Sequence, residues 1–236
     1  MNTLAIVPHY RHADTLPEVT AALRRHGLTV LVVDDGSGED CRAVLETLRA
    51  DGIEILWRGQ NGGKGAAMKD GFRWARQHGF SHVVQIDADA QHRFDDIGTL
   101  LAASAAAPDA LVCGRPVYGA DAPKARLYGR KITDFWNMLH TGSLQIKDGM
   151  CGFRIYPLAP SCEVIERETV GDRMDFDNEI LIRLYWRGVP LRWIDTLVSY
   201  RSGGVSHFHV WRDNCLISKM HARLFFARLA RLAGLR

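Results

Sequence analysis

Two carboxylates one residue apart, Asp87 and Asp89, follow a short apolar run of the chain that is typical of a β-strand. Both can approach a hard divalent cation, and Gln91 adds a further oxygen donor. Mg²⁺ or Mn²⁺ bound in this way keeps its remaining positions for water and for the phosphate groups of a substrate. By itself, the pair also fits a solvated turn, so the metal site needs support from other residues.

Two other turns carry groups that suit a nucleotide. Asp34 and Asp35 follow an earlier apolar run. One of these carboxylates could accept hydrogen bonds from a base or ribose. The alternative is that they cap the following helix or form its turn. Gly63 and Lys64 open a predicted helix, where backbone N–H groups and an ammonium suit a phosphate. The glycine spacing is neither that of a Walker A loop nor that of GxGxxG, and a plain flexible turn is the alternative.

Alternating elements position these turns. Predicted strands over 3–7, 29–33, 53–57, 82–86 and 110–113 alternate with predicted helices over 14–26, 39–50, 63–78 and 95–107. Continuously apolar strands in this rhythm predict an α/β fold, with a doubly wound, mostly parallel central sheet and helices on both faces. Ligands of such sheets gather beyond the carboxyl ends of the strands, where all three turns fall. The second half predicts helices over 124–140, 177–187 and 215–235 and extended segments over 153–156 and 191–200.

Composition and charge exclude several classes of protein. The chain has 236 residues, 47% of them hydrophobic, and a net charge of only +3, so we expect no nucleic acid partner. Seven of the Lys and Arg residues and one acid lie from residue 201 onward, which makes the tail suited to an anionic membrane or a lipid phosphate. Five cysteines without a CxxC pair disfavour a disulfide framework and a zinc finger. With no signal peptide and no membrane-spanning run, we expect a cytoplasmic protein, with attachment to the inner face of the membrane left open.

Together, the turns resemble glycosyltransferase family 2, whose fold is called GT-A. Four motifs of that family follow in its order over residues 1–115: Pro8-His9-Tyr10, Val33-Asp34-Asp35-Gly36-Ser37, Asn61 to Ala67, and Asp87-Ala88-Asp89. Later segments resemble the dolichyl- or polyprenyl-phosphate hexose synthases, and these are Gln91-His92, Gly114-Arg115, 126–131, 148–154 and 176–180. The resemblance therefore implies one GT-A catalytic domain over 1–212, with a nucleotide-sugar half (1–115) and an acceptor half (116–212), followed by a basic helix over 213–236.

The resemblance implies transfer of a hexose, with inversion, from a UDP- or GDP-linked sugar to a polyprenyl phosphate. A metal ion, Mg²⁺ or Mn²⁺, would neutralise the departing diphosphate on Asp87, Asp89 and Gln91. The residues expected to hold the nucleotide sugar are Pro8, Tyr10, Asp34, Asp35, Gly63, Lys64, Asp87, Arg115, Arg126 and Arg130. Arg126 and Arg130 lie four residues apart and share a face of the predicted helix.

The acceptor decides which residues take part in the reaction. A hydroxyl acceptor needs a base, and Asp177 and Glu179 are the candidates. They lie two apart on a predicted helix, so at most one faces the site, and a helix-capping role is the alternative. A phosphate acceptor needs no base, and Arg154 and Arg201 then matter more. His207 is expected to contact the acceptor as well.

Departures from the branch leave alternatives open. Arg11 replaces an acidic residue or Asn, and His207 stands where the branch often has Lys. A family 2 enzyme acting on a hydroxyl acceptor (a lipid, polyketide or saccharide) and an inactive nucleotide-sugar-binding protein are the two alternatives. A nucleotidyltransferase is disfavoured because Pro8 to Arg11 occupies the place of its glycine-rich loop. Whether the chain forms a homodimer is also left open.

Overall fold

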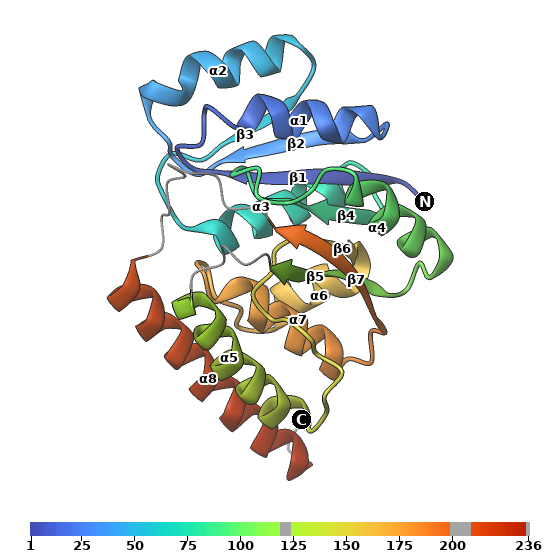
Figure 1. Ribbon diagram of the computed structural model, residues 1–236, viewed down its shortest axis with the longest axis vertical. Helices are drawn as coiled ribbons and strands as arrows, with labels where there is room; N and C mark the ends of the chain where they lie inside the picture. Colours follow the sequence, from blue (N-terminus) through green and yellow to red (C-terminus); the bar gives the residue numbers. More distant parts are fainter. Residues whose placement is uncertain (119–123, 199–208, 235–236) are drawn as a thin grey trace.

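A seven-stranded sheet forms the centre of the computed structural model, which describes residues 1–118, 124–198 and 209–234. The strand order within these residues is β3-β2-β1-β4-β6-β5-β7 (Figure 1). The strands are β1 (Thr3–His9), β2 (Thr29–Asp34), β3 (Glu54–Trp57), β4 (His82–Gln85), β5 (Leu111–Tyr118), β6 (Arg154–Pro157) and β7 (Leu191–Val198). Strands β1 to β4 pair in parallel, as do β5 and β7, and β6 runs antiparallel to β4 and β5.

Helices cover both faces of this sheet, which confirms the predicted doubly wound, mostly parallel α/β fold. They are α1 (Leu16–Arg25), α2 (Glu39–Ala50), α3 (Lys64–Gln77), α4 (Asp96–Ala106), α5 (Lys124–Thr141), α6 (Leu158–Arg167), α7 (Phe176–Trp186) and α8 (Val210–Leu232). Helices α1, α2 and α4 lie on one face, and α3, α6 and α7 lie on the other. Helix α8 lies beside α5 at the lower left of Figure 1.

Strands β1 and β2 are largely apolar because they are buried on both sides, whereas the edge strands β3 and β7 are partly exposed. Along β1, Leu4 and Ile6 point into the core beneath α3 and α7, whereas Ala5 and Val7 point into the core beneath α1 and α4. All four side chains are fully buried. The parallel register places His9 beside Asp34, so the turns that follow these strands meet at one edge of the sheet.

The structure differs from the sequence-based expectation at α6, β5 and α8, and α8 begins at Val210 although the helix was predicted from residue 215. Helix α6 follows β6 directly, although no helix was predicted there, and Pro160 is tolerated because it lies in the first turn. The strand predicted over 110–113 continues to Tyr118, because β7 pairs with it along its whole length. Strands β4, β6 and β5 are neighbours, so the two halves of the sequence share one sheet.

Helix α8 packs on the body of the protein through a buried histidine pair. His221 Nδ1 lies 3.0 Å from His140 Nε2 of α5, and the ring of Trp136 stacks on both imidazoles. Met220 and Leu224 of α8 are fully buried in the core beside α7. Burial lowers the pKa of both histidines to about 4, and Arg228 acts in the same direction on His140.

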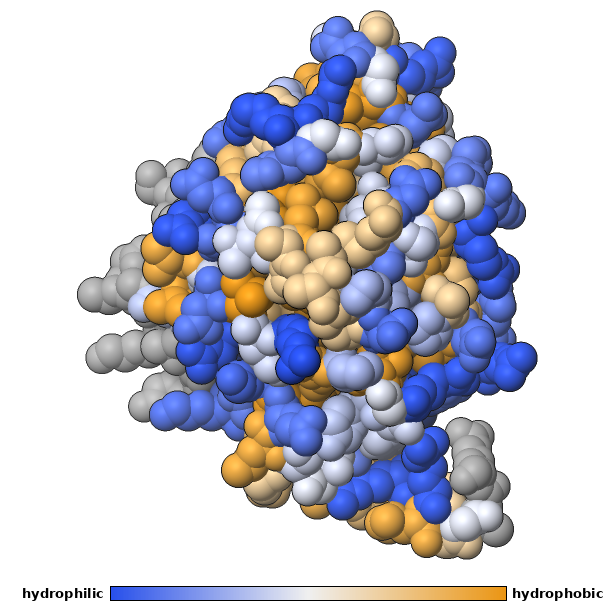
Figure 2. All heavy atoms as spheres, turned by 90° about the vertical axis from the view of Figure 1, so that its right-hand side faces the viewer, coloured by the Kyte–Doolittle hydropathy of each residue, from blue (hydrophilic) through white to orange (hydrophobic). Residues whose placement is uncertain are grey.

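The surface is mixed in polarity. Hydrophobic and hydrophilic side chains are interspersed on the face shown in Figure 2, including its lower end. Exposed hydrophobic side chains on α5 and α8 are Ile132, Phe135, Met138, Val210, Trp211, Phe226, Leu229 and Leu232. Within the described ranges, no helix combines the length and the apolar character that crossing a bilayer requires.

The histidine pair predicts a pH-dependent stability. Because the folded-state pKa values lie below the unfolded value of about 6.5, the unfolded chain binds more protons between pH 6.5 and 4, and stability falls as the pH is lowered through this window. Urea unfolding at pH 7 and pH 5 should show a loss of roughly 1–3 kcal/mol from the pair. His221→Gln should flatten this dependence, whereas His26→Gln, at an exposed position, should not. An unchanged pH dependence in His221→Gln would refute the assignment.

Candidate functional site

Three elements meet at the ammonium group of Lys64, the first residue of α3. Its Nζ lies 2.6 Å from Oδ1 of Asp87, in the turn after β4, and 2.8 Å from Oδ2 of Asp177, at the start of α7. Gln85 Nε2 donates a hydrogen bond to the other oxygen of Asp177 at 2.8 Å. We call these four residues the Lys64 cluster. The structure therefore brings together Lys64, Asp87 and Asp177, which the sequence assigned to a single site.

Electrostatics favours the charged forms of Lys64 and Asp87. Burial by itself would lower the pKa of Lys64, but the carboxylates of Asp177 and Asp87 outweigh it and raise that pKa. Burial would raise the pKa of Asp87, but the Lys64 ammonium outweighs it and lowers that pKa. The Asp87 side chain is 28% exposed, against 5% for Asp177, so the cluster opens to solvent on the Asp87 side.

Gly152 and Arg154 support the cluster from β6 and the segment before it. A Cβ atom on Gly152 would lie 2.4 Å from Lys64 Nζ and 2.7 Å from Gln85 Nε2, so a larger residue there would have to displace the ammonium or the Gln85 amide. Arg154 is fully buried and donates to the backbone carbonyls of Asp177 and Gly149. The structure thus places the Arg154 guanidinium behind the cluster, where it holds the backbone of Asp177 rather than facing solvent.

The carboxylate of Asp34 lies in a buried network at the end of β2. Its Oδ1 lies 2.9 Å from His9 Nδ1 and accepts a hydrogen bond from Ser37 Oγ at 2.5 Å. Burial would raise the pKa of Asp34, but the hydrogen bonds from His9 and Ser37 outweigh it and lower that pKa. Asp34 therefore joins the turn after β1 to the turn after β2.

Asp35 shapes the glycine-rich turn. Its carboxylate accepts hydrogen bonds from the backbone N–H groups of Gly62 at 2.9 Å and Gly63 at 2.7 Å, and pairs with Arg58. The left-handed backbone at Gly63, with φ of 102°, favours glycine, and its neighbour Arg173 leaves no room for a Cβ atom. Burial raises the pKa of Asp35. The Gly63 N–H, predicted to face a phosphate, is bound to Asp35 in this structure.

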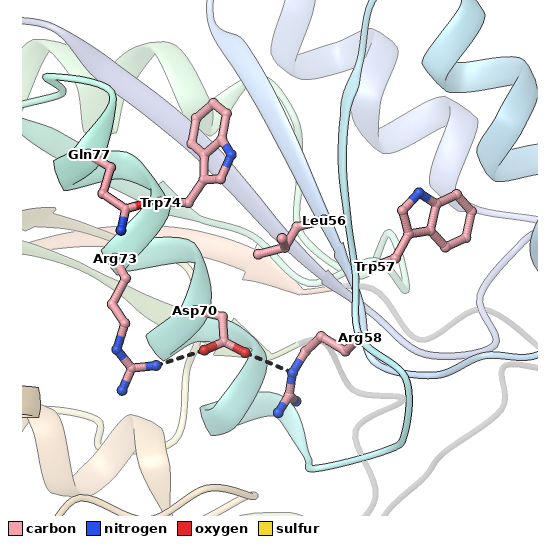
Figure 3. Close-up of a pocket in the computed structure, with 7 residues that line it drawn as sticks. All are labelled: Leu56, Trp57, Arg58, Asp70, Arg73, Trp74 and Gln77. Carbon is pink, nitrogen blue, oxygen red and sulfur yellow. Dashed lines mark hydrogen bonds and ion pairs between the residues drawn. The ribbon is translucent and has the colours of Figure 1, made fainter.

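A hollow lies on the outer side of this turn, between β3 and α3. It is lined by Leu56, Trp57, Arg58, Asp70, Arg73, Trp74 and Gln77. Figure 3 shows Asp70 between Arg58 and Arg73, with its oxygens 2.8 Å from Arg58 Nε and 2.7 Å from Arg73 Nη1. The lining includes none of the predicted site residues, so this hollow is separate from the Lys64 cluster.

The turn after β4 is tight. Asp89 Oδ1 accepts a hydrogen bond from the backbone N–H of Gln91 at 3.1 Å, and Ala90 between them adopts a left-handed φ of 54°. Arg11, in the turn after β1, has a φ of 56°, and within the described residues these are the two non-glycine positions with positive φ. Both strained turns lie beyond the carboxyl ends of strands of the sheet.

The predicted metal ligands fit a divalent cation by their chemistry. Asp87, Asp89 and Gln91 offer oxygen atoms from one turn, and Asp87 already faces a cation, the ammonium of Lys64. In the part of the chain that the structure describes, no group of three or more His, Cys, Asp or Glu side chains forms a closed metal cage. An open set of two carboxylates and an amide suits Mg²⁺ or Mn²⁺ completed by water and phosphate.

Other predicted nucleotide-sugar residues lie around this edge with partners of their own. Arg115 Nε and Nη2 each lie 2.6 Å from an oxygen of Asp195. Arg130 pairs with Asp148 and lies over the Tyr118 ring, with Cζ 5.0 Å from its centroid. The predicted Pro8 is the last but one residue of β1.

The predicted residue Tyr10 lies next to Arg11 in the turn after β1. The Arg11 guanidinium lies over the Tyr10 ring, with Cζ 5.2 Å from its centroid. Arg201 and His207 lie outside the described residues, as does the side chain of Arg126 near the start of α5.

Glu179 lies apart from the Lys64 cluster. It is fully buried, and its oxygens lie 2.7 Å from Arg183 Nη2 and 2.5 Å from Arg223 Nη2 of α8. It also accepts a hydrogen bond from the backbone N–H of Gly171 at 2.9 Å. Of the two acids considered as bases, Asp177 alone joins the cluster. The two-residue spacing on a helix predicted that at most one of them would face the site.

Several residues that build the site were given no individual role from the sequence. They are His9, Arg58, Gln85, Asp148 and Gly152. Of these, His9, Asp148 and Gly152 lie in segments that carry the family resemblance. A signal existed for Gln85, because a polar side chain interrupts an apolar strand directly before Asp87. For Arg58 the pattern gave no signal, since its partner Asp35 is distant in the sequence.

Comparison with known proteins decides the family. The model of the family "Glycosyl transferase family 2" matches residues 4–165. The chain belongs to this family. The predicted GT-A fold and the predicted glycosyltransferase family are thereby confirmed.

Two curated relatives confirm the predicted branch of family 2. The chain is 31% identical over 162 residues to a polyprenol monophosphomannose synthase of Mycolicibacterium smegmatis, and this match covers 65% of the chain and 61% of that enzyme's length. It is 29% identical over 186 residues to an undecaprenyl-phosphate mannosyltransferase of Micrococcus luteus, over 74% of the chain and 76% of the relative.

Solved structures share the fold. A glucosyl-3-phosphoglycerate synthase of Mycobacterium tuberculosis in complex with phosphoglyceric acid superposes with a TM-score of 0.68 at 16% identity, over 96% of this chain and 79% of that one. A mannosyltransferase of Pyrobaculum calidifontis in complex with GDP-Man and Mn²⁺ gives a TM-score of 0.62 at 16% identity, over 98% and 64% of the two chains.

The different partners of the two acids predict different variant behaviour. Glu179→Gln removes the fully buried carboxylate that Arg183 and Arg223 share, so each guanidinium keeps only one acidic partner (Glu168 or Asp175), and the free energy of unfolding should fall by about 3 kcal/mol. Asp177→Asn leaves Lys64 paired with Asp87 and should cost less than half of that. Urea unfolding of both variants measures the difference, and equal losses would contradict these separate roles.

Proposed function

We propose that the protein transfers a hexose from a nucleotide sugar to a polyprenyl phosphate at a membrane surface, with inversion at the anomeric carbon. The observation that carries this proposal is the Lys64 cluster, which places one ammonium and two carboxylates beyond the carboxyl end of β4. The two curated relatives, both named for polyprenyl-phosphate mannose transfer, support the acceptor class and favour mannose as the sugar.

The diphosphate of the donor lies against cationic groups in this proposal. Lys64 contacts it from the start of α3, and Arg130 and Arg115 approach from α5 and β5. A Mg²⁺ or Mn²⁺ ion on Asp87, Asp89 and Gln91 supplies Lewis-acid stabilisation of the departing diphosphate. The GDP-Man and Mn²⁺ complex of the Pyrobaculum protein supports a divalent ion in a protein of this fold.

The base and ribose of the donor lie at the turns after β1 and β2. Tyr10 and the backbone around Asp34 and Asp35 form this part of the site, and Pro8 lies next to the last residue of β1 beside them. Because Asp35 fixes the Gly62-Gly63 turn, it positions the segment that leads directly into Lys64.

The state of Asp177 favours a phosphate acceptor over a hydroxyl one. A general base needs a carboxylate that is free to take a proton, but Asp177 holds Lys64 with one oxygen and accepts a hydrogen bond from Gln85 with the other. Glu179 is bound by two guanidinium groups. A phosphate monoester is already ionised at neutral pH and needs no base.

A transfer assay tests the proposal. The purified chain is incubated with radiolabelled GDP-mannose or UDP-glucose, a polyprenyl phosphate in detergent, and Mn²⁺ or EDTA. We expect a lipid-linked sugar with one donor, loss of product with EDTA, and at least a roughly hundredfold lower rate in Asp89→Asn. Asp95→Asn, an exposed carboxylate in the following loop, serves as the matched control and should keep the wild-type rate.

The outcomes separate the alternatives. Label found in a product of polyprenol or another hydroxyl compound, and absent with polyprenyl phosphate, would replace the acceptor class. Binding of a donor without any transfer would favour an inactive nucleotide-sugar-binding protein. A wild-type rate in Asp89→Asn would overturn the metal site.

The proposed acceptor places the protein at a membrane, and α8 suits this location. Its exposed side chains include Arg212 and Lys219 together with hydrophobic Trp211 and Phe226. Basic residues near an anionic membrane surface contribute about 1 kcal/mol each, and exposed aromatic side chains enter the headgroup region.

Vesicle binding tests the role of α8. Vesicles containing phosphatidylglycerol should bind the protein at low salt and release it at high salt. The double variant Arg212→Glu/Lys219→Glu should bind at least roughly thirtyfold more weakly, because it loses two contributions of about 1 kcal/mol each and adds repulsion. Arg25→Glu/Arg49→Glu, on helices α1 and α2, is the control with the same change in net charge. Equal binding of the two double variants would contradict docking through α8.

A further inference from the structure

The ammonium of Lys64 occupies a cation position beside Asp87. Its Nζ contacts Asp87 Oδ1 at 2.6 Å, and it is packed so closely against Gly152 that a Cβ atom there would lie 2.4 Å away. The Lys64 side chain is only 15% exposed. An ammonium and a divalent ion on the same carboxylate oxygen would repel each other strongly in so poorly hydrated a place.

We infer that Lys64 is an internal stand-in for the divalent ion, and that it leaves Asp87 when the ion and the donor bind together. This inference rests on the proposed function, because it takes Asp87 as a metal ligand and a nucleoside diphosphate as the donor's leaving group. The lysine makes metal binding and nucleotide binding mutually dependent.

Asp177 keeps its ion pair with Lys64 throughout this exchange. It holds the ammonium at 2.8 Å from the side away from solvent and is itself fixed by Gln85. Once Lys64 leaves Asp87, the ammonium keeps one carboxylate partner while its other side turns to an incoming phosphate. The flexible four-carbon stem of lysine allows this small displacement without movement of α3.

Charge balance explains why both ligands are needed. A divalent ion that binds alone displaces Lys64 from Asp87 and leaves the ammonium short of one negative partner. A nucleoside diphosphate supplies that partner, and its own charge is neutralised by the ion. Each ligand therefore raises the affinity for the other, and the coupling is reciprocal.

Calorimetric titration of the protein with MnCl₂ tests the inference. Each titration is done without nucleotide and with a saturating concentration of GDP or UDP, according to which of the two binds. Lys64→Met should bind Mn²⁺ alone at least tenfold more tightly than the wild type, and nucleotide should then raise its Mn²⁺ affinity far less. Lys69→Met is the matched control, because Lys69 lies on the same helix but pairs with Asp172 at 2.8 Å. It should titrate like the wild type.

The results distinguish failure of the inference from failure of the proposed function. If the wild type binds Mn²⁺ with nucleotide present but Lys64→Met gains no affinity for Mn²⁺ alone, the stand-in role is wrong and the metal site stands. If the wild type binds no Mn²⁺ with either nucleotide, the metal site of the proposed function is wrong. Should Lys64→Met fold poorly, Lys64→Gln is titrated in its place, and the rise in unfolding temperature on addition of Mn²⁺ must exceed that of the wild type.

Discussion

The two ion pairs of Lys64 are the constraint on which the site depends. They join Asp87, from the first half of the sequence, to Asp177, from the second half, through one ammonium group. Charges with so little access to water are stable only with partners. Removing Lys64 leaves both carboxylates without their cation, and removing either carboxylate leaves the ammonium with one partner in place of two. The relative position of β4, α3 and α7 is therefore fixed by the same groups that we propose to bind the donor.

Close backbone packing makes this arrangement possible. A Cβ atom on Gly65 would lie 2.6 Å from Phe176 Cβ and 2.7 Å from the Gly171 carbonyl oxygen, so α3 and the start of α7 meet without side chains between them. This contact brings Asp177 within reach of Lys64. The glycines after β3 thus divide two tasks: Gly65 permits this close contact, and Gly62 and Gly63 present the N–H groups that bind Asp35 and fix the turn.

Local patterns predicted the strands, the turns and their meeting at one edge, because burial on both faces makes inner strands such as β1 and β2 largely apolar. The two-residue spacing also predicted that Asp177 and Glu179 diverge. Contacts between distant segments were beyond the sequence: the guanidinium of Arg154 turns inward to backbone carbonyls, and α8 is anchored by Arg223 and His221. These depend on tertiary packing, which periodicity does not encode.

A crystal structure with a nucleoside diphosphate and Mn²⁺ bound tests the central claim most directly. The account predicts the ion on Asp87 and Asp89, with Lys64 Nζ released from Asp87, still paired with Asp177 and in contact with a phosphate oxygen. A nucleotide bound elsewhere, such as the hollow between β3 and α3, with the Lys64 ion pairs unchanged, would contradict it.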